Sequence, residues 1–527
     1  MAPRVLARAA RWLNEKVNGR PRAVYGAATT GRMAEDWMAQ ILSADAEMRY
    51  VLSTLRARSR QLVRDNAHAA GFVHALVDGV LGEAAIGVNP RARTADDTLD
   101  DAANRVLWDA WCQWQRREVC SADGQTNFAE LQRLIFRTWA TDGEVLVRRG
   151  FGAPNAFGYD LQVIDADLLD ERYNVAPEPG RHEVRMGVEI DARGRPVAYH
   201  LFQRHPHDVF FTPTQDRVRV PADQILHLFL QLRPGQTRGV PPLTPVMLAL
   251  RLLDEYTIAE LMMARVASSA GGFFETDPDA YTPSQDAPDG TSASKSIRLD
   301  LEPGVSQQLP PGITFKAWDP KHPTDAFEPF QKVLLRMVAR GSGSGVSYAT
   351  LTGDLSEANY SSDRAGRLAE RDAWRGLQRW FADRLLCPVY TDVVRFGLLA
   401  GAIPLRLADA PRLAAHAFEY RGWPWVDPVK DISAAAQELA LRLTSPQRVC
   451  AERGRDFETI LEEWAEAERL ADQYGVSLST APATSGAQPA APADTETDDT
   501  EDPAEDAPSP PKRAARAVAL RLTGGRA

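Results

Sequence analysis

The sequence predicts an α+β fold, in which blocks of helix and blocks of strand follow one another along the chain. Helical periodicity prevails in residues 50–140, whereas alternating patterns typical of strands prevail in 144–230. Two long helical patterns then enclose a second strand-like stretch at 273–320. Because the sequence has no βαβ rhythm and no internal repeat, neither a doubly wound sheet nor a solenoid is expected.

Three helices are expected before the first strand, at 50–80, 98–119 and 126–140. The second carries an apolar stripe, made of Leu99, Ala103, Val106, Leu107, Ala110, Trp111 and Trp114. Four tryptophans could anchor elements or subunits to one another, although core packing is the favoured use: Trp108, Trp111, Trp114 and Trp139. A TDGE turn leads to a strand at 144–148. Further strands are predicted at DLQVIDADLLD, VRMGVEI, PVAYHLF and QILHLFL, with a D-A-R-G turn joining the middle two.

Two long helices are predicted in the second half of the body. In the first, we expect Thr244 as N-cap, Pro245 at the first helical position and Gly271–Gly272 at the end. Such a helix has about 26 residues and is roughly 39 Å long. The second is DAFEPFQKVLLRMVARG. Between them, residues 304–320 resemble a β-hairpin. A polar loop of small residues follows, and further helices are expected at 362–400 and 430–476.

The composition is that of a globular protein with unusual ends. Forty-four per cent of the residues are apolar and 25% charged, and no apolar run is long enough to cross a membrane. The basic N-terminal stretch MAPRVLARAARWLNEKV fits an amphipathic surface helix better than an organelle-targeting segment, and it lacks the features of a secretory signal. From residue 477 an acidic segment rich in Ala, Pro and Thr is expected to be disordered. The final KRAARAVALRLTGGRA is either a solvated terminus or a short partner-binding helix.

The sequence contains no recognisable catalytic, cofactor or metal motif. The glycine-rich GSGSGVS at 341–347 fits neither a P-loop nor a nucleophile elbow, so a flexible loop is expected. His200, His205 and His207, close to Asp208, lack metal-ligand spacing and are expected in an exposed turn.

Two carboxylate pairs have no evident partners for acid–base work: Asp165 with Asp167, and Asp254 with Glu255. The four cysteines, Cys112, Cys120, Cys387 and Cys450, show no CxxC spacing, which argues against a disulfide framework or a zinc site. The net charge of −10 argues against a protein that grips nucleic acid, but not against one that only surrounds it.

Three stretches carry a resemblance to a known family. They are FAELQRLIFRTWATDGEVLVRR at 128–149, VPADQILHLFLQLRPGQTRGVPPLTPV at 220–246 and VSYATLTGDLSEANYSSDRAGRLAERDAW at 346–374. Together with the order of elements at 241–361, they resemble the lambda-type family of phage portal proteins, over residues 50–425.

The resemblance implies a non-enzymatic ring, usually of twelve subunits, at one capsid vertex of the virion, assembled in the host cytoplasm. Double-stranded DNA is packaged and ejected through such a ring. The partners implied are the terminase large subunit, a head-completion or connector protein, and the major capsid and scaffolding proteins. No membrane and no cofactor is implied.

The resemblance also assigns segments by their order. They are an N-terminal arm at 1–49, a wing at 50–240, stem helix 1 at 241–272, a β-containing clip at 273–322, stem helix 2 at 323–341, a tunnel loop at 342–361, a helical part of the wing at 362–429, crown helices at 430–476 and the tail at 477–527.

Candidate channel-lining residues lie in the second stem helix and in the loop after it. Glu328, Lys332, Arg336 and Arg340 are four residues apart on one helix face, with the apolar side chains elsewhere. This stripe either faces DNA or is a solvated face with internal ion pairs. The loop offers small or neutral side chains that suit a mobile constriction: Ser344, Ser347, Tyr348, Thr350 and Thr352.

A DNA-processing enzyme, such as a nuclease or a packaging ATPase, is the alternative. An ATPase should carry a P-loop and an acidic metal ligand after a strand, and the sequence shows neither.

Overall fold

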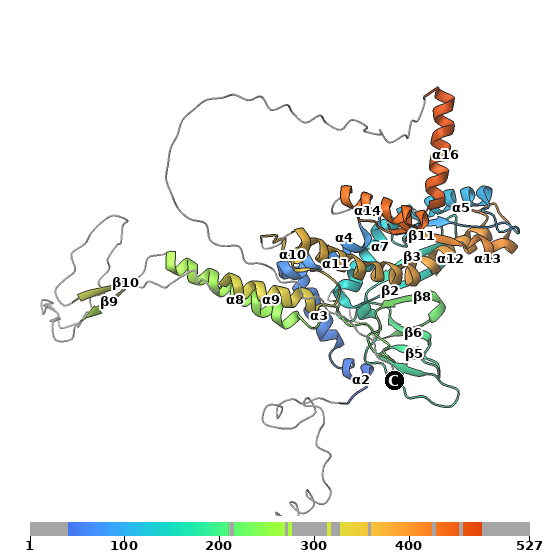
Figure 1. Cartoon of the computed structure of the whole chain (residues 1–527). Coiled ribbons are helices and arrows are strands. Elements are labelled where there is room, and N and C mark those ends of the chain that lie inside the picture. The colour runs from blue at the N-terminus through green and yellow to red at the C-terminus, as the bar shows by residue number, and fades with distance from the viewer. Residues whose placement is uncertain are drawn as a thin grey trace, which may run out of the picture. The chain divides into compact units, whose positions relative to one another are not determined.

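The computed structural model describes residues 41–208, 210, 216–268, 272–276, 313–317, 327–356, 360–423, 428–452 and 457–476 (Figure 1). The chain divides into two compact units, Met1–Leu461 and Glu462–Ala527, and of the second only 462–476 is described. The predicted N-terminal helix, the tail and most of the predicted clip lie outside the described residues. Among the described helices, none combines the length and the apolar character that crossing a bilayer requires.

The first predicted helix is divided in two at Asn66. Three helices open the described chain: α2 (Ala44–Met48), α3 (Leu52–Asp65) and α4 (Ala67–Leu81). Asn66 has an extended backbone and its side chain accepts a hydrogen bond of 3.0 Å from the Ala69 amide. It therefore ends α3 and caps α4, so the prediction of one helix over 50–80 was wrong.

The second predicted helix is also divided, into α5 (Asp101–Trp114) and α6 (Arg117–Cys120), whereas the third forms as α7 (Phe128–Asp142). Trp111 and Trp114 are buried and stacked, with ring centroids 5.2 Å apart, and Trp139 is buried too. Core packing is thus confirmed for these three tryptophans. Trp108 is the exception, because its side chain is 44% exposed.

Two antiparallel sheets follow. The first has the order β3-β2-β8, and the second the order β4-β5-β6-β7. VRMGVEI is not one strand but a hairpin, since Met186 and Gly187 adopt positive φ between β4 and β5. A small pair, β1 with β11, joins distant parts of the chain. The strand bounds are β1 (Gly87–Pro90), β2 (Glu144–Phe151), β3 (Tyr159–Ile164), β4 (Glu183–Arg185), β5 (Val188–Ile190), β6 (Pro196–Phe202), β7 (Arg217–Pro221), β8 (Ile225–Phe229) and β11 (His416–Glu419).

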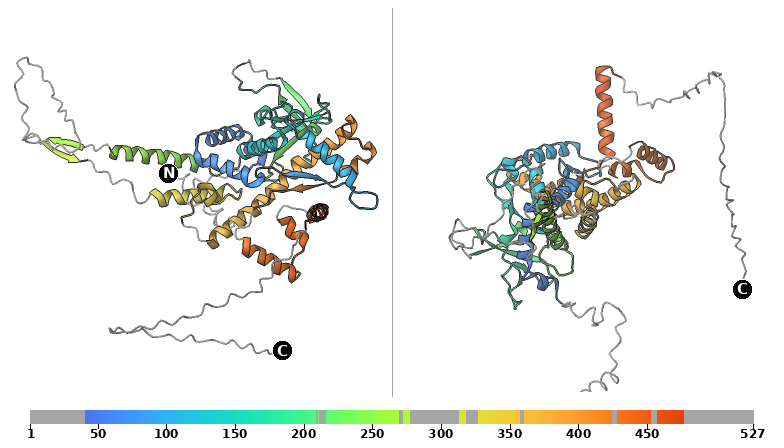
Figure 2. Two further views of the ribbon diagram at one scale, coloured as in Figure 1. Left: turned by 90° about the horizontal axis from the view of Figure 1, so that it is seen from above. Right: turned by 90° about the vertical axis from the view of Figure 1, so that its left-hand side faces the viewer.

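The two predicted long helices are α8 (Met247–Ser268) and α9 (Phe327–Gly341), which lie side by side (Figures 1 and 2). The predicted cap of α8 was wrong. Thr244 donates its hydroxyl to the Pro241 carbonyl in a turn, at 2.7 Å, and the helix begins at Met247. Strand β10 (Ile313–Ala317) is the described part of the predicted hairpin at 304–320, and it pairs with β9 (Gly272–Thr276), which lies outside that hairpin. Gly272, predicted to end the helix, is part of β9.

The remaining helices agree with the predicted helical blocks, apart from α10 in the predicted loop and the short α13 between the two blocks. They are α10 (Tyr348–Thr352), α11 (Tyr360–Phe381), α12 (Cys387–Ala400), α13 (Ala410–Leu413), α14 (Pro428–Ala440), α15 (Pro446–Glu452) and α16 (Phe457–Tyr474). A π-turn at Ala382–Leu386 joins α11 to α12. Cys387 follows, and Pro388 after it has no amide hydrogen to donate to the preceding turn, which accounts for the locally widened helix.

The main hydrophobic core lies where the helices pack on the first sheet. It contains Phe72 and Leu76 of α4, Phe136 of α7, Val145 of β2 and Phe381 of α11, all completely buried. A second cluster lies under the four-stranded sheet. Residues from both halves of the sequence therefore build one core.

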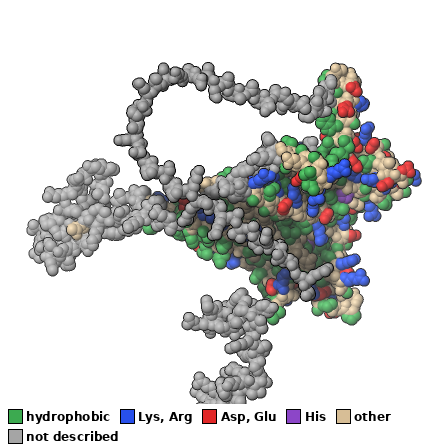
Figure 3. Space-filling view, viewed as in Figure 1, with side chains coloured by type: hydrophobic (Ala, Val, Ile, Leu, Met, Phe, Trp, Pro, Cys, Tyr) green, Lys and Arg blue, Asp and Glu red, His purple; other side chains and the backbone are tan. Residues whose placement is uncertain are grey.

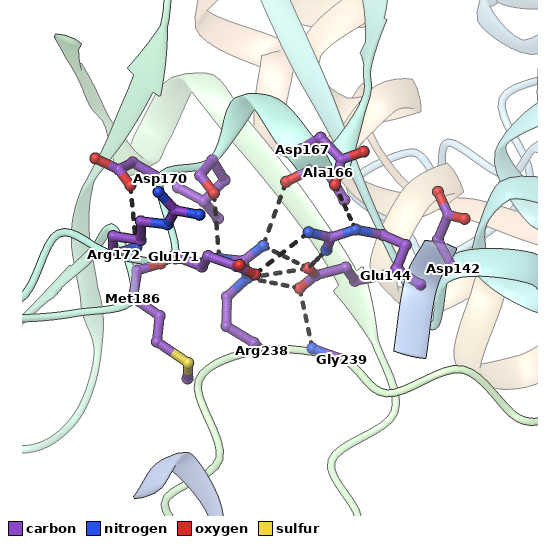
Figure 4. A network of polar contacts seen from close by, with 12 residues as sticks. Asp142, Glu144, Ala166, Asp167, Asp170, Glu171, Arg172, Met186, Arg238 and Gly239 are labelled. Carbon is purple, nitrogen blue, oxygen red and sulfur yellow. Dashed lines mark hydrogen bonds and ion pairs between the residues drawn. The ribbon is translucent and has the colours of Figure 1, made fainter. Parts of the chain in front are cut away.

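A buried carboxylate, Glu144 at the start of β2, joins the first sheet to α3 and to the connection at 238–239 (Figure 4). Its oxygens accept hydrogen bonds from Arg238 at 2.6–3.0 Å, from Arg56 at 2.9 Å and from the Gly239 amide at 3.0 Å. His227 Nε2 of β8 lies 3.0 Å away. Burial alone would raise the pKa of Glu144, but the charge of Arg238 and the His227 contact hold it well below its usual range. Glu144 is therefore the charged centre of the network.

The Asp165/Asp167 pair belongs to the same region and has partners that the sequence did not reveal. Arg60 of α3 binds Asp142 at 2.6 Å, Asp165 at 2.7 Å and Asp167 at 2.6 Å. His205 Nε2 lies 3.5 Å from Asp167, and its ligand atom and those of the two aspartates lie within 4.8 Å of one another. Because Arg60 already occupies both carboxylates, we interpret this cluster as a structural salt-bridge network.

The histidine cluster was only partly predicted correctly. His207 is exposed after β6, as expected. His200 lies within β6, with its side chain only 12% exposed and its Nε2 3.3 Å from Glu189. Burial lowers the pKa of His200, opposed by Glu189. The exposed-turn interpretation is therefore wrong for this residue.

Replacing Glu144 with Gln should strongly destabilise the fold. The amide keeps the shape of the side chain but leaves Arg238 buried without its counter-charge, while Arg56 keeps its pairing with Asp167 at 2.6 Å. We expect the free energy of unfolding to fall by about 3–5 kcal/mol. Urea unfolding followed by circular dichroism, at neutral pH and constant protein concentration, measures the loss.

The exposed Glu255, which pairs with Arg251 at 2.9 Å on α8, is the matched control, and Glu255→Gln should change little. The effect of Glu144→Gln should also depend on pH. Since the pKa of Glu144 is depressed, its charge contributes stability that is present above the ordinary value of 4.5 and is lost as the pH falls. The difference in unfolding free energy between wild type and Glu144→Gln should become smaller in acid. A difference that does not change with pH would contradict a charged Glu144.

Candidate functional site

The predicted channel segment consists of α9, the glycine-rich connection after it and α10. Lys332 on α9 is directed toward acidic groups: its Nζ lies 2.8 Å from Glu328 and 3.9 Å from Asp354, and only 17% of its side chain is exposed. Within this segment the prediction of an internal ion pair from Glu328 is therefore confirmed. Lys332 is a poor candidate for contacting a passing phosphate.

Arg336 and Tyr348 hold α9 and α10 together. The Arg336 guanidinium carbon lies 5.2 Å from the centre of the Tyr348 ring, and the Tyr348 hydroxyl donates to Asp354 at 2.9 Å. Hydrogen bonds from Ser356 and Tyr348, with the nearby Lys332, lower the pKa of Asp354 to about 2. A cluster of basic, aromatic and acidic side chains thus connects the two helices.

The exposed face of α9 mixes charge with apolar surface. Arg336 and Arg340 are exposed, and so are Val333 at 60% and Met337 at 49%. At about 100° per residue these four side chains share one face of the helix. The prediction that the apolar residues lie elsewhere holds for the buried Val338 but was wrong for Val333 and Met337.

α10 replaces the predicted polar loop by one turn of helix. The Ser347 hydroxyl caps it by accepting from the Thr350 amide at 3.2 Å, and Thr352 donates to the Tyr348 carbonyl at 2.8 Å. Ser344 is buried and bonded to Ser342. The predicted polar residues therefore bond to one another, to neighbouring backbone and to the carboxylates of Asp354 and Glu370. Of the five only Thr350 is exposed.

Glu370 of α11 is a residue that sequence reasoning missed. It is only 5% exposed, and its two oxygens accept from the Ser347 amide at 2.9 Å and from the Thr350 hydroxyl at 3.0 Å. Burial raises the pKa of Glu370, whereas these hydrogen bonds and Arg367 lower it. No sequence signal could have found it, because Glu370 lies on another helix, 23 positions after Ser347 and 20 after Thr350.

A second surface adjoins the segment. The exposed face of α8 carries Leu248 at 69%, Leu252 at 54%, Ile258 at 52% and Met262 at 57%. Figure 3 shows hydrophobic side chains along α8 and α9 where grey atoms do not cover them. An apolar surface on two adjacent helices is typical of a protein–protein interface.

Comparison with known proteins identifies the family. Residues 30–378 match the family described as phage portal protein, lambda family. The chain belongs to this family. The matched residues include α9, α10 and Glu370, so the predicted channel segment is part of the family's shared region. The absence of catalytic motifs from the sequence agrees with the structural, non-enzymatic character of portal proteins.

Curated relatives support the assignment. The chain is 33% identical over 450 residues to a probable portal protein of Halomonas phage phiHAP-1, covering 84% of this chain and 86% of the relative. It is 23% identical to the portal protein of Escherichia phage N15, over 82% of this chain and 86% of that protein. It is also 21% identical to portal protein B of Escherichia phage lambda, over 82% of this chain and 87% of that protein.

Solved structures show a weaker similarity. One is a chain in the neck of a native gene transfer agent particle, computed with C12 symmetry, with a TM-score of 0.40 and 15% identity over 75% of this chain and 93% of that one. Another is a chain in the neck of an empty particle, computed with C6 symmetry. It has a TM-score of 0.39 and 17% identity, over 81% of this chain and 99% of that one.

Two glycines before α10 give a test of its packing. Gly345 and Gly343 both have positive φ, but a Cβ on Gly345 would lie 2.5 Å from the Ala373 Cβ, whereas Gly343 faces open space. Gly343→Ala should cost about 1–2 kcal/mol of stability from the backbone alone. Gly345→Ala should cost more stability, because the new methyl group would overlap Ala373 of α11 and push the connection before α10 away from that helix. Thermal unfolding of the two variants compares them, and equal losses would contradict this packing.

Proposed function

We propose that this chain forms the ring at one vertex of a tailed-phage capsid, through which double-stranded DNA is packaged and ejected. Membership of the portal family is the observation that carries the proposal. A homo-oligomeric ring, of twelve subunits as is usual in the family, also gives a use to the exposed apolar faces of α8 and α9. In a closed ring each subunit meets its neighbours through two different surfaces.

Within the ring, we assign α8 and α9 to the stem and the β9–β10 pair to the clip. The N-terminal helices and both sheets, with α11 and α12, form the wing. The helices α14–α16 form the crown, and α10 belongs to the tunnel segment. These assignments follow the order of elements and are supported by the two adjacent long helices with a strand pair between them in the sequence.

The clip is the proposed docking surface for the terminase large subunit during packaging and for a head-completion or connector protein afterwards. The rest of the ring would contact the major capsid and scaffolding proteins. The protein would thus be assembled in the host cytoplasm and retained in the virion, without a cofactor and without a catalytic role.

The exposed Arg336 and Arg340 are the proposed channel contacts. A polyanion that moves through a ring must not be held at many phosphates, since each neutralised phosphate adds affinity. Lys332 is held by Glu328 and Asp354, which reduces its contribution. The segment then presents a small positive charge next to neutral side chains, which allows contact without tight binding.

Ring formation can be tested directly. End-on negative-stain images of the purified full chain should show annular particles with a central hole. Leu248→Glu with Leu252→Glu on α8 should reduce them to smaller species without unfolding the subunit, because a buried interface cannot accept these charges. Val218→Glu, at a 42% exposed position on β7, is the control. Observing only monomers and dimers, at all protein and salt concentrations tested, would reject the proposed ring.

The channel assignment can be tested in assembled particles. Arg336→Glu with Arg340→Glu should leave rings intact but reduce the amount of DNA packaged or retained, because the positive charge is reversed. Arg340→Glu alone avoids disturbing the stacking of Arg336 on Tyr348. Arg117→Glu, an exposed position on α6, is the control. Unchanged DNA content in both channel variants would remove α9 from the channel wall.

A further inference from the structure

α10 is bounded by residues that allow it to move as a piece. Gly343 and Gly345 precede it with φ of +67° and +81°, and Gly353 follows it with φ of +71°. Glycine adopts this left-handed backbone at little cost and can leave it as easily. A one-turn helix between such positions needs contacts outside itself to stay in place, because an isolated helix of this length is unstable.

Glu370 supplies such a contact in a specific way. In a capping box, a Glu at the third helical position accepts the amide of the N-cap residue. In α10 the third position is Thr350, which cannot do this, and Glu370 of α11 accepts the Ser347 amide instead, at 2.9 Å. Its other oxygen accepts from the Thr350 hydroxyl at 3.0 Å. The capping box of α10 is therefore completed by a different helix.

The other contacts of α10 fix it less specifically. Leu351 is buried and α10 packs against α4, where a Cβ on Gly71 would make only an ordinary van der Waals contact, 3.9 Å from the Leu351 carbonyl oxygen. Tyr348 packs against Arg336 on α9. Apolar and cation–π contacts tolerate small shifts, whereas two hydrogen bonds to one buried carboxylate tolerate few. Glu370 thus defines the position of the first turn.

We propose that Glu370 is a positioning residue for the channel, which ties α10 to α11 and keeps this turn in place while DNA passes. The inference rests on the proposed function, since it requires α10 to lie at the channel. Loss of the two hydrogen bonds frees α10 to move about the flanking glycines. A ring with twelve freed turns then retains its packaged DNA less well.

The first experiment measures the position of α10 without DNA. In full-length protein purified as rings, Glu370→Gln should increase hydrogen exchange of the 347–352 amides about tenfold, while α4 and α12 stay protected. The amide side chain offers a single acceptor oxygen and no charge, so it cannot accept from both the Ser347 amide and the Thr350 hydroxyl and binds them more weakly. Asp372→Asn is the matched control, an exposed α11 carboxylate that pairs with Arg375 at 2.9 Å. Unchanged exchange in Glu370→Gln overturns the inference.

A change on the other partner keeps the test independent of the α11 fold. Thr350→Val removes one of the two hydrogen bonds to Glu370 from an exposed position and leaves the buried surroundings of Glu370 intact. It also removes the hydrogen bond of 3.0 Å that Thr350 accepts from the Ser347 hydroxyl. It should increase exchange in the same residues. The double variant with Glu370→Gln should show less than the sum of the two effects, because both remove the same tie. Fully additive effects on hydrogen exchange would contradict a shared tie between Thr350 and Glu370.

The second experiment measures DNA in particles assembled with each variant. Glu370→Gln should lose packaged DNA faster than wild type on mild heating, and Asp372→Asn should not. Faster exchange with unchanged DNA retention would overturn the link between α10 and DNA, and with it the place of α10 in the channel. Annular images of the same variant separate that outcome from a failure of the ring itself.

Discussion

The buried charge of Glu144 is the constraint on which the body of the protein depends. Moving an ion from water into a protein interior costs several kcal/mol, and the cost is recovered only when every partner is in place. The partners come from α3, from β8 and from the connection at 238–239. These segments must therefore fold together. The network contributes specificity more than net stability, because it penalises any arrangement that leaves one charge without its partners.

The same constraint fixes the start of α8. Arg238 and Gly239 contact Glu144 directly, and Leu243 and Val246 are buried in the core just before the helix. Gly143, with φ of +84°, allows the backbone at Val240 to pass so closely that any Cβ would overlap it. α8 thus leaves a rigid base, and its apolar face is presented in a defined direction. A ring built from such helices needs this rigidity, since small errors in angle would prevent closure.

Local patterns in the sequence predicted α7, β2 and the bodies of α8 and α9, because periodicity and turn residues lie within the elements themselves. The sequence did not reveal that helices are interrupted at Asn66 and at Arg116. At Asn66 side-chain capping outweighs periodicity, whereas Arg116 has an extended backbone and no side-chain cap. It also missed α10, whose first turn depends on Glu370 from a later helix. The stripe on α9 was predicted, but the pairing of Lys332 with Asp354 depends on a fold that brings two segments together. Partners distant in sequence account for most of the errors.

An acidic subunit can therefore handle DNA for a reason that is visible in α9. The three cationic side chains of α9 have different environments. Lys332 faces carboxylates, Arg336 lies over an aromatic ring, and Arg340 is exposed at the end of the helix. Pairing Lys332 within the subunit lowers the number of phosphates that each subunit can neutralise, and affinity falls steeply with that number. If α9 lines the channel as proposed, the carboxylates of this region also repel the phosphate backbone. If α10 borders the channel as proposed, the tie to Glu370 matters for this balance, because it determines how far neutral side chains stand between the arginines and the DNA.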